Sequence, residues 1–105
     1  MRLRACIAAL ALVTCNAVAA ADGADPGRQL FVKDASPPCA ICHALVDADA
    51  TGAIGPSLDE LKPDVDRVIK AVKTGIGQMP AFPQLSDEQI QAIARYVARA
   101  SGGAK

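Results

Sequence analysis

The sequence is poor in the residues that build a large hydrophobic core. Its 105 residues contain no tryptophan, one tyrosine and two phenylalanines, so aromatic side chains make up only 3% of the chain. A chain of this size is marginally stable when it depends on hydrophobic burial alone, and natural domains of this size usually contain disulfides, a metal or a large cofactor. The scarcity of aromatic residues therefore predicts one small domain that needs such a support.

The chain also lacks an excess of charge of either sign. Lysine and arginine together number 11, aspartate and glutamate number 11, and the formal net charge is zero. A nucleic-acid-binding domain needs a basic surface, and a membrane-surface binder needs a polybasic or amphipathic segment. No apolar run is long enough to span a membrane. We therefore expect no nucleic-acid partner and no membrane span.

Residues 1–21 have the three-part pattern of a secretory signal peptide. Arg2 and Arg4 precede the apolar run ACIAALALV, and the small residues of NAVAAA follow it. We expect cleavage after Ala21. Residues 22–105 would then form one exported domain in the periplasm.

Two alternatives concern this leader. Cleavage after Ala19 fits the pattern nearly as well. The stretch LVTC resembles a lipoprotein box, which would place a lipid anchor on Cys15, but Thr14 stands where such boxes usually have Gly, Ala or Ser. Plain export remains the preferred interpretation.

Hydrophobic periodicity predicts an all-α fold with three main helices. The apolar residues recur at helical spacing in about residues 26–34, 64–74 and 87–100. A short helical turn is expected at residues 39–45, and residues 46–62 read as a long loop. No strand pattern is visible in the sequence.

The expected helix ends have suitable capping residues. Asp25 and Ser86 are placed as N-caps, and Gln89 can complete a capping box with Ser86. Gly75 follows the second helix, where a C-terminal glycine is common.

Residues 39–43, CAICH, are the motif with the most specific chemistry. After loss of the leader, Cys39 and Cys42 are the only cysteines, which excludes a framework of several disulfides. Two thiols one helical turn apart can form thioethers with the two vinyl groups of one haem, and His43 can then bind the iron. Covalent attachment needs no deep enclosing pocket, which suits a small domain. The motif predicts one covalently bound haem c per chain.

Three other uses of a C-x-x-C pair remain open. A structural zinc site requires four ligands, whereas this motif offers two thiols and one histidine. A thioredoxin-like redox pair would suit an exported protein, but that fold needs strands that alternate with helices. A simple disulfide is the third. Haem attachment is the interpretation that we favour.

Met79 is the candidate for the second axial ligand of the iron. It is the only methionine outside the leader, and Gly77 and Pro80 hold its segment, GIGQMPAF, out of regular structure. A ligand strap across a haem face needs such a backbone, whereas a methionine is otherwise most often core filler. His43 is the only histidine, so two histidine ligands within one chain are excluded. Lys73 or an open sixth position are the alternatives.

With these motifs together, the chain resembles a small class I cytochrome c of bacterial type. CAICH, IGPSL and GQMPAF occur in the order of that family, and the resemblance covers about residues 26–101. It implies a small cytochrome c fold, in which the N- and C-terminal helices cross and long loops wrap one covalently attached haem. The stretch KDASPP before Cys39 departs from the family by lengthening that connection. Pro37 and Pro38 would lie near the haem edge, where the insertion could shape docking or be inert.

The resemblance also implies roles for single residues. Gly27 and Phe31 match the positions where the first helix crosses the last, and Tyr96 matches their aromatic partner. Pro56 matches the residue whose carbonyl accepts the Nδ1 hydrogen of the ligating histidine, unless it is an ordinary turn residue. Four further residues are expected to form the haem walls, although they are also ordinary core positions. They are Ile54, Leu58, Val72 and Ile76.

Ligation by His43 and Met79 implies an electron carrier and not an enzyme, because both axial positions are filled. Expected partners are an exported dehydrogenase, a terminal oxidase or another cytochrome. Residues 40–64 are similar to small cytochromes that pair with molybdenum-containing sulfite dehydrogenases, so a dedicated subunit of such an enzyme is the alternative function. A haem catalyst such as a peroxidase would require Met79 to leave the iron.

Overall fold

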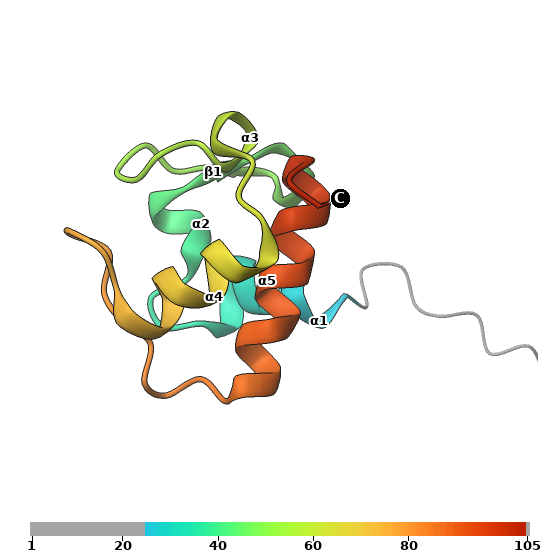
Figure 1. The fold of residues 1–105 in the computed structure, drawn as a ribbon. Coiled ribbons are helices and arrows are strands. Elements are labelled where there is room, and N and C mark those ends of the chain that lie inside the picture. The colour runs from blue at the N-terminus through green and yellow to red at the C-terminus, as the bar shows by residue number, and fades with distance from the viewer. Residues whose placement is uncertain (1–24, 105) are drawn as a thin grey trace, which may run out of the picture.

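Three helical segments frame the structure, a computed structural model that describes residues 25–104 (Figure 1). The first consists of α1 (Pro26–Gln29) and the π-helical turn η1 (Leu30–Asp34), which follows without a break. The others are α4 (Val65–Thr74) and α5 (Asp87–Ser101). The mostly helical fold confirms the predicted class and the three predicted helices.

The helix ends are capped by the expected residues. The carboxylate of Asp25 accepts hydrogen bonds from two backbone N–H groups of the first turn of α1. Ser86 and Gln89 form both halves of a capping box at the start of α5. Gly75 ends α4 with a φ of +69°, a conformation that favours glycine.

The segment between the first helix and α4 contains more structure than the sequence predicted. Two-residue strands pair antiparallel, with Ala44 opposite Thr51 and Leu45 opposite Ala50. The predicted helical turn to Leu45 is wrong beyond Cys42, because His43 is extended (φ −114°, ψ 136°) and leads into the first strand. The elements of this segment are α2 (Cys39–Cys42), β1 (Ala44–Leu45), the 3-10 turn η2 (Val46–Ala48), β2 (Ala50–Thr51) and α3 (Leu58–Leu61).

The first helix crosses α5 at close range, and the core lies beside this crossing. A Cβ atom on Gly27 would lie 2.6 Å from the Cβ atom of Tyr96, so only glycine allows this approach. The rings of Phe31 and Tyr96 meet edge to face, with their centroids 6.1 Å apart. Both side chains are fully buried. The predicted pairing of these residues is confirmed.

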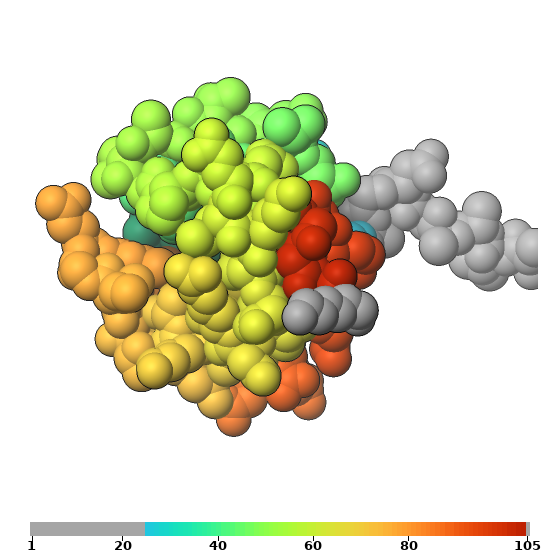
Figure 2. Space-filling model, turned by 45° about the horizontal axis from the view of Figure 1, so that its top comes forward, coloured from blue at the N-terminus to red at the C-terminus, as the bar shows by residue number. Residues whose placement is uncertain are grey.

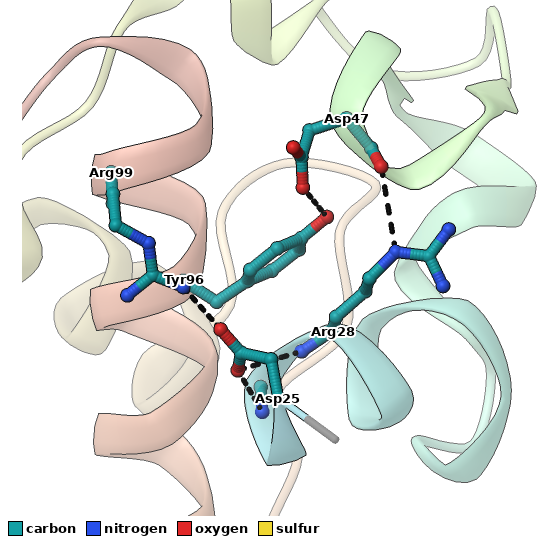
Figure 3. Close-up of polar contacts among 6 residues, drawn as sticks. Asp25, Arg28, Asp47, Tyr96 and Arg99 are labelled. Atoms are coloured by element: carbon teal, nitrogen blue, oxygen red, sulfur yellow. Dashed lines mark hydrogen bonds and ion pairs between the residues drawn. The ribbon is translucent and has the colours of Figure 1, made fainter. Parts of the chain in front are cut away.

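A polar network surrounds the same crossing (Figure 3). The Tyr96 hydroxyl donates to the Asp47 carboxylate over 2.7 Å, and Nε of Arg28 donates to the Asp47 carbonyl oxygen over 3.4 Å. Asp25 and Arg99 form an ion pair. Burial, followed by the bond to Asp47, raises the pKa of Tyr96 well above its usual range. The network ties η2, and with it the strand pair after His43, to the two crossing helices.

The predicted signal peptide, residues 1–21, and the lipid anchor considered at Cys15 lie outside the described residues. Within residues 25–104, no helix combines the length and the hydrophobicity needed to cross a membrane.

Candidate functional site

A cavity of about 840 Å³ lies between α2, the loop before α3 and the segment after α4. The space-filling view shows an indentation between the green segment around residues 50–56 and the orange segment around residues 75–80 (Figure 2). Most of its lining is apolar. The cavity brings together all the site residues expected from the sequence, namely Cys39, Cys42, His43, Ile54, Pro56, Leu58, Val72, Ile76 and Met79.

The two thiols lie at the ends of the single turn α2. This turn begins after Pro38, whose backbone is extended, and the His43 N–H donates to the Cys39 carbonyl over 2.9 Å. Cys39 and Cys42 are free thiols and are half-buried. Burial is the main cause that raises the pKa of Cys39 to about 11, so this thiol is protonated at neutral pH. Both sulfur-bearing side chains face one cavity from one helical turn.

The imidazole of His43 is oriented by the loop that precedes α3. Its Nδ1 atom lies 2.7 Å from the carbonyl oxygen of Pro56. Because a carbonyl can only accept, this contact assigns the hydrogen to Nδ1 and leaves the lone pair of Nε2 free to bind a metal. The contact is the one that the family resemblance implied for Pro56.

Two glycines that the sequence did not single out allow this loop to approach the CAICH segment. A Cβ atom on Gly55 would lie 2.6 Å from Cε1 of His43, and one on Gly52 would lie 2.6 Å from the carbonyl carbon of Cys42. The Gly55 N–H also donates to the Cys42 carbonyl over 2.7 Å. Their spacing before Pro56, in the stretch GAIGP, was the available signal.

Met79 closes a tight turn directly after α4. The Met79 N–H donates to the Ile76 carbonyl over 2.9 Å, and the Ile76 N–H donates to the Met79 carbonyl over 3.1 Å. Gly77, which lies between them, has a φ of +55°. A Cβ atom on Gly75 would lie 2.8 Å from the Met79 carbonyl oxygen. The irregular backbone predicted around Met79 is confirmed, and it holds the methionine, which is partly buried, at the cavity.

The chain returns to α4 directly after this turn, where the Phe82 N–H donates to the Val72 carbonyl over 2.9 Å. The expected wall residues fall into two groups. Leu58 and Val72 are buried, whereas Ile54 and Ile76 are each 70% exposed at the cavity. Large apolar side chains with this exposure leave a surface that an apolar group could cover.

The residues present fit a covalently bound haem. Two thiols, an imidazole with a free Nε2 and one thioether share a cavity whose volume lies in the usual range for ligand sites, roughly 300–1,000 Å³. Lys73, the alternative to Met79, does not line this cavity, and its Nζ lies 3.1 Å from the Asp87 carboxylate. Among residues 25–104, no three His, Cys, Asp or Glu side chains are arranged to hold a metal ion directly. The geometry therefore favours haem over zinc.

Comparisons with known proteins find similar cytochromes. The family model described as cytochrome c oxidase, cbb3-type, subunit III matches residues 22–97. A cytochrome c6 from Leptolyngbya boryana is 41% identical over 64 aligned positions, and the match covers 56% of this chain and 75% of that relative. The crystal structure of the c-type cytochrome SorU from Sinorhizobium meliloti has a TM-score of 0.72 and 54% identity. That match covers 76% of this chain and 92% of the solved chain.

Proposed function

The chain belongs to the class I c-type cytochromes, and from this we propose that it carries one haem c, attached through Cys39 and Cys42 and ligated by His43 and Met79. It is an electron carrier and not an enzyme. The haem, when bound, supplies an iron that changes between the ferric and ferrous states. The observation that carries the proposal is that one cavity brings Met79 together with Cys39, Cys42 and His43, which lie on a distant segment of the chain.

His43 is the proposed proximal ligand. The bond from its Nδ1 to the Pro56 carbonyl fixes the ring orientation and tautomer and makes Nε2 a stronger ligand. Ligands held in this way do not need to reorganise when the iron changes its charge. This rigidity supports electron transfer at low cost in reorganisation.

Met79 is the proposed distal ligand. The turn from Ile76 to Met79 and the contact of Gly75 with the Met79 backbone hold the thioether at the cavity. A methionine ligand favours ferrous iron and raises the reduction potential. If His43 and Met79 both bound the iron, no substrate could reach it, and this property would separate a carrier from a haem catalyst.

The apolar lining, including Leu58, Val72, Ile54 and Ile76, would cover the haem faces. This burial replaces the large core that the aromatic-poor sequence cannot supply. The haem would therefore contribute to folding as well as to function.

We further propose that residues 1–21 are a signal peptide and that residues 22–105 act in the periplasm. There the protein would exchange electrons with an exported dehydrogenase and with a terminal oxidase or another cytochrome. The similarity of residues 40–64 to cytochromes that pair with sulfite dehydrogenases favours one alternative, a dedicated subunit of a molybdenum enzyme. Rapid, saturable reduction of this protein by a sulfite dehydrogenase encoded beside it would support the alternative, and a neighbourhood without such an enzyme would argue against it.

The experiment that tests the proposal is expression of the whole chain in a bacterium with a cytochrome c maturation system. The intact mass of the exported protein should equal that of residues 22–105 plus one haem. Its alkaline pyridine spectrum should be that of a haem with both vinyl groups saturated. The Cys39→Ala variant, as a matched control, should show a spectrum with one vinyl group remaining. A folded, exported protein without covalent haem would contradict the proposal.

A further inference from the structure

Among the described residues, two side chains that line the cavity are formally charged, and both are cations. Arg67 and Lys70 lie three positions apart on α4, so they share one face of the helix. No aspartate or glutamate of residues 25–104 lines the cavity. The mostly apolar wall therefore has one place with two positive charges.

Neither of these cations has a side-chain partner within residues 25–104. The hydrogen bonds and ion pairs of this part of the chain do not include the guanidinium of Arg67 or the ammonium of Lys70. The nearby carboxylates are those of Asp64 and Asp66 at the start of α4, and that of Asp87 on α5. Asp64 accepts the Arg67 backbone N–H over 2.8 Å, Asp87 pairs with Lys73, and Asp66 does not line the cavity.

Haem has two carboxylates on the edge of its ring that lies opposite the vinyl groups. The thiols that would bind the vinyl groups belong to α2, which packs on η1 and β2. The two cations belong to α4, which packs on α5. The thiols and the cations therefore reach the same cavity from different elements. We propose that Arg67 and Lys70 bind the two haem carboxylates, an inference that rests on the proposed function.

This arrangement has an electrostatic consequence. Guanidinium and ammonium groups form charge-assisted hydrogen bonds with carboxylates, and a planar guanidinium can bind one through two parallel bonds. The pairing neutralises two negative charges beside the iron. Negative charge stabilises ferric iron, so the two cations hold the reduction potential higher than an unpaired haem would have.

The test compares the Arg67→Gln and Lys70→Gln variants with Arg95→Gln. Arg95 is exposed on α5 and does not line the cavity, so its replacement removes one positive charge elsewhere. Reduction potentials are measured on the haem-loaded proteins from about pH 5 to about pH 9. Both cavity variants should have lower potentials than the control, and the potential should depend more steeply on pH, because a carboxylate without its cation has a higher pKa. Arg67→Lys should restore most of the potential.

Each outcome addresses the inference separately from the proposed function. Mass and the alkaline pyridine spectrum report covalent haem on the same samples. Haem-loaded cavity variants with the potential and pH profile of Arg95→Gln would overturn the carboxylate assignment and leave the proposed function intact. A wild-type protein without covalent haem would overturn the proposed function itself. If Arg67→Gln does not accumulate, Lys70→Gln alone makes the same comparison, because Lys70 is an exposed residue.

Discussion

The Nδ1 atom of His43 lies 2.7 Å from the carbonyl oxygen of Pro56, 13 residues further along the chain. This bond depends on a loop that packs directly on the imidazole and on the backbone of Cys42, where Gly52 and Gly55 leave no room for a Cβ atom. The loop thus orients the proposed iron ligand through the protein alone. These two glycines therefore help to position the proposed ligand.

Replacement of Gly55 by alanine tests this dependence. The new Cβ would lie 2.6 Å from Cε1 of His43, so the loop or the ring must move. We expect the free energy of unfolding of the haem-loaded protein to fall by about 1–3 kcal/mol, as is usual for overpacking. Denaturant unfolding measures it. Ala53→Ser, at an exposed neighbouring position, should change stability by less than about 0.5 kcal/mol, and equal losses in the two variants would count against the packing argument.

Gly75 and Gly77 form a matched pair for the Met79 turn. Both have positive φ, but a Cβ on Gly75 would meet the Met79 carbonyl oxygen at 2.8 Å, whereas one on Gly77 would meet nothing within 4 Å. Gly77→Ala should cost about 1–2 kcal/mol from backbone strain alone. Gly75→Ala should cost more and should release the methionine at a lower denaturant concentration. Absorbance of the ferric iron–sulfur bond in the far red follows this release, and coincident curves for both variants would contradict the expectation.

Because Tyr96 is buried and hydrogen-bonded to Asp47, we expect the free energy of unfolding to fall at alkaline pH. Burial and then Asp47 raise the pKa of Tyr96, so the folded protein keeps a proton that the unfolded chain loses near pH 10. This contribution is fully present below about pH 10 and is lost as the pH rises further. Tyr96→Phe should lower the free energy of unfolding at pH 7 by about 1 kcal/mol and should flatten its decline between about pH 10 and 11. Denaturant unfolding at both pH values measures this, and parallel declines for the two proteins would disprove it.

The long helices and the Cys39–His43 part of the site could be predicted because their signals are local, whereas the role of Pro56 was expected from the family resemblance. Helical spacing and caps such as Asp25 and Ser86 act within a few residues, and CAICH is a continuous motif. The short ladder β1–β2 could not be predicted, because two-residue strands have no periodicity and exist only through pairing across η2. Roles for Gly52 and Gly55 were missed for a similar reason: their spacing in GAIGP was visible, but the segment that they approach, CAICH, lies elsewhere in the sequence.

The π-helical turn η1 shows another limit of the sequence. Leu30 and Phe31 predicted a helix there, and the structure has one. The Ala35 N–H donates to the Leu30 carbonyl, five residues back, over 3.0 Å. The path of the chain after a helix decides which carbonyl accepts the last hydrogen bond, and here the chain turns toward Cys39. Helical periodicity in the sequence does not indicate this path.

Electron transfer to soluble partners should depend weakly on ionic strength. The formal net charge of the whole chain is zero, and loss of Arg2 and Arg4 with the leader leaves 9 basic and 11 acidic residues in residues 22–105, a net charge of only −2. The acidic residues Asp64 and Asp66 lie beside Arg67 at the start of α4. A surface without a large field of one sign gives little electrostatic steering. Stopped-flow rates at rising salt concentration measure it. A steep fall in rate would point instead to a charged docking surface.

The central claim is that the Met79 sulfur binds the iron and makes the protein a carrier. The most direct measurement is the far-red absorbance of the ferric protein, together with its reduction potential, in Met79→Ala and in the control Lys73→Ala. Because the thioether favours ferrous iron, Met79→Ala should lose the band and have a lower potential, whereas Lys73→Ala should retain both. A Met79→Ala protein that keeps the band and the wild-type potential would contradict the account.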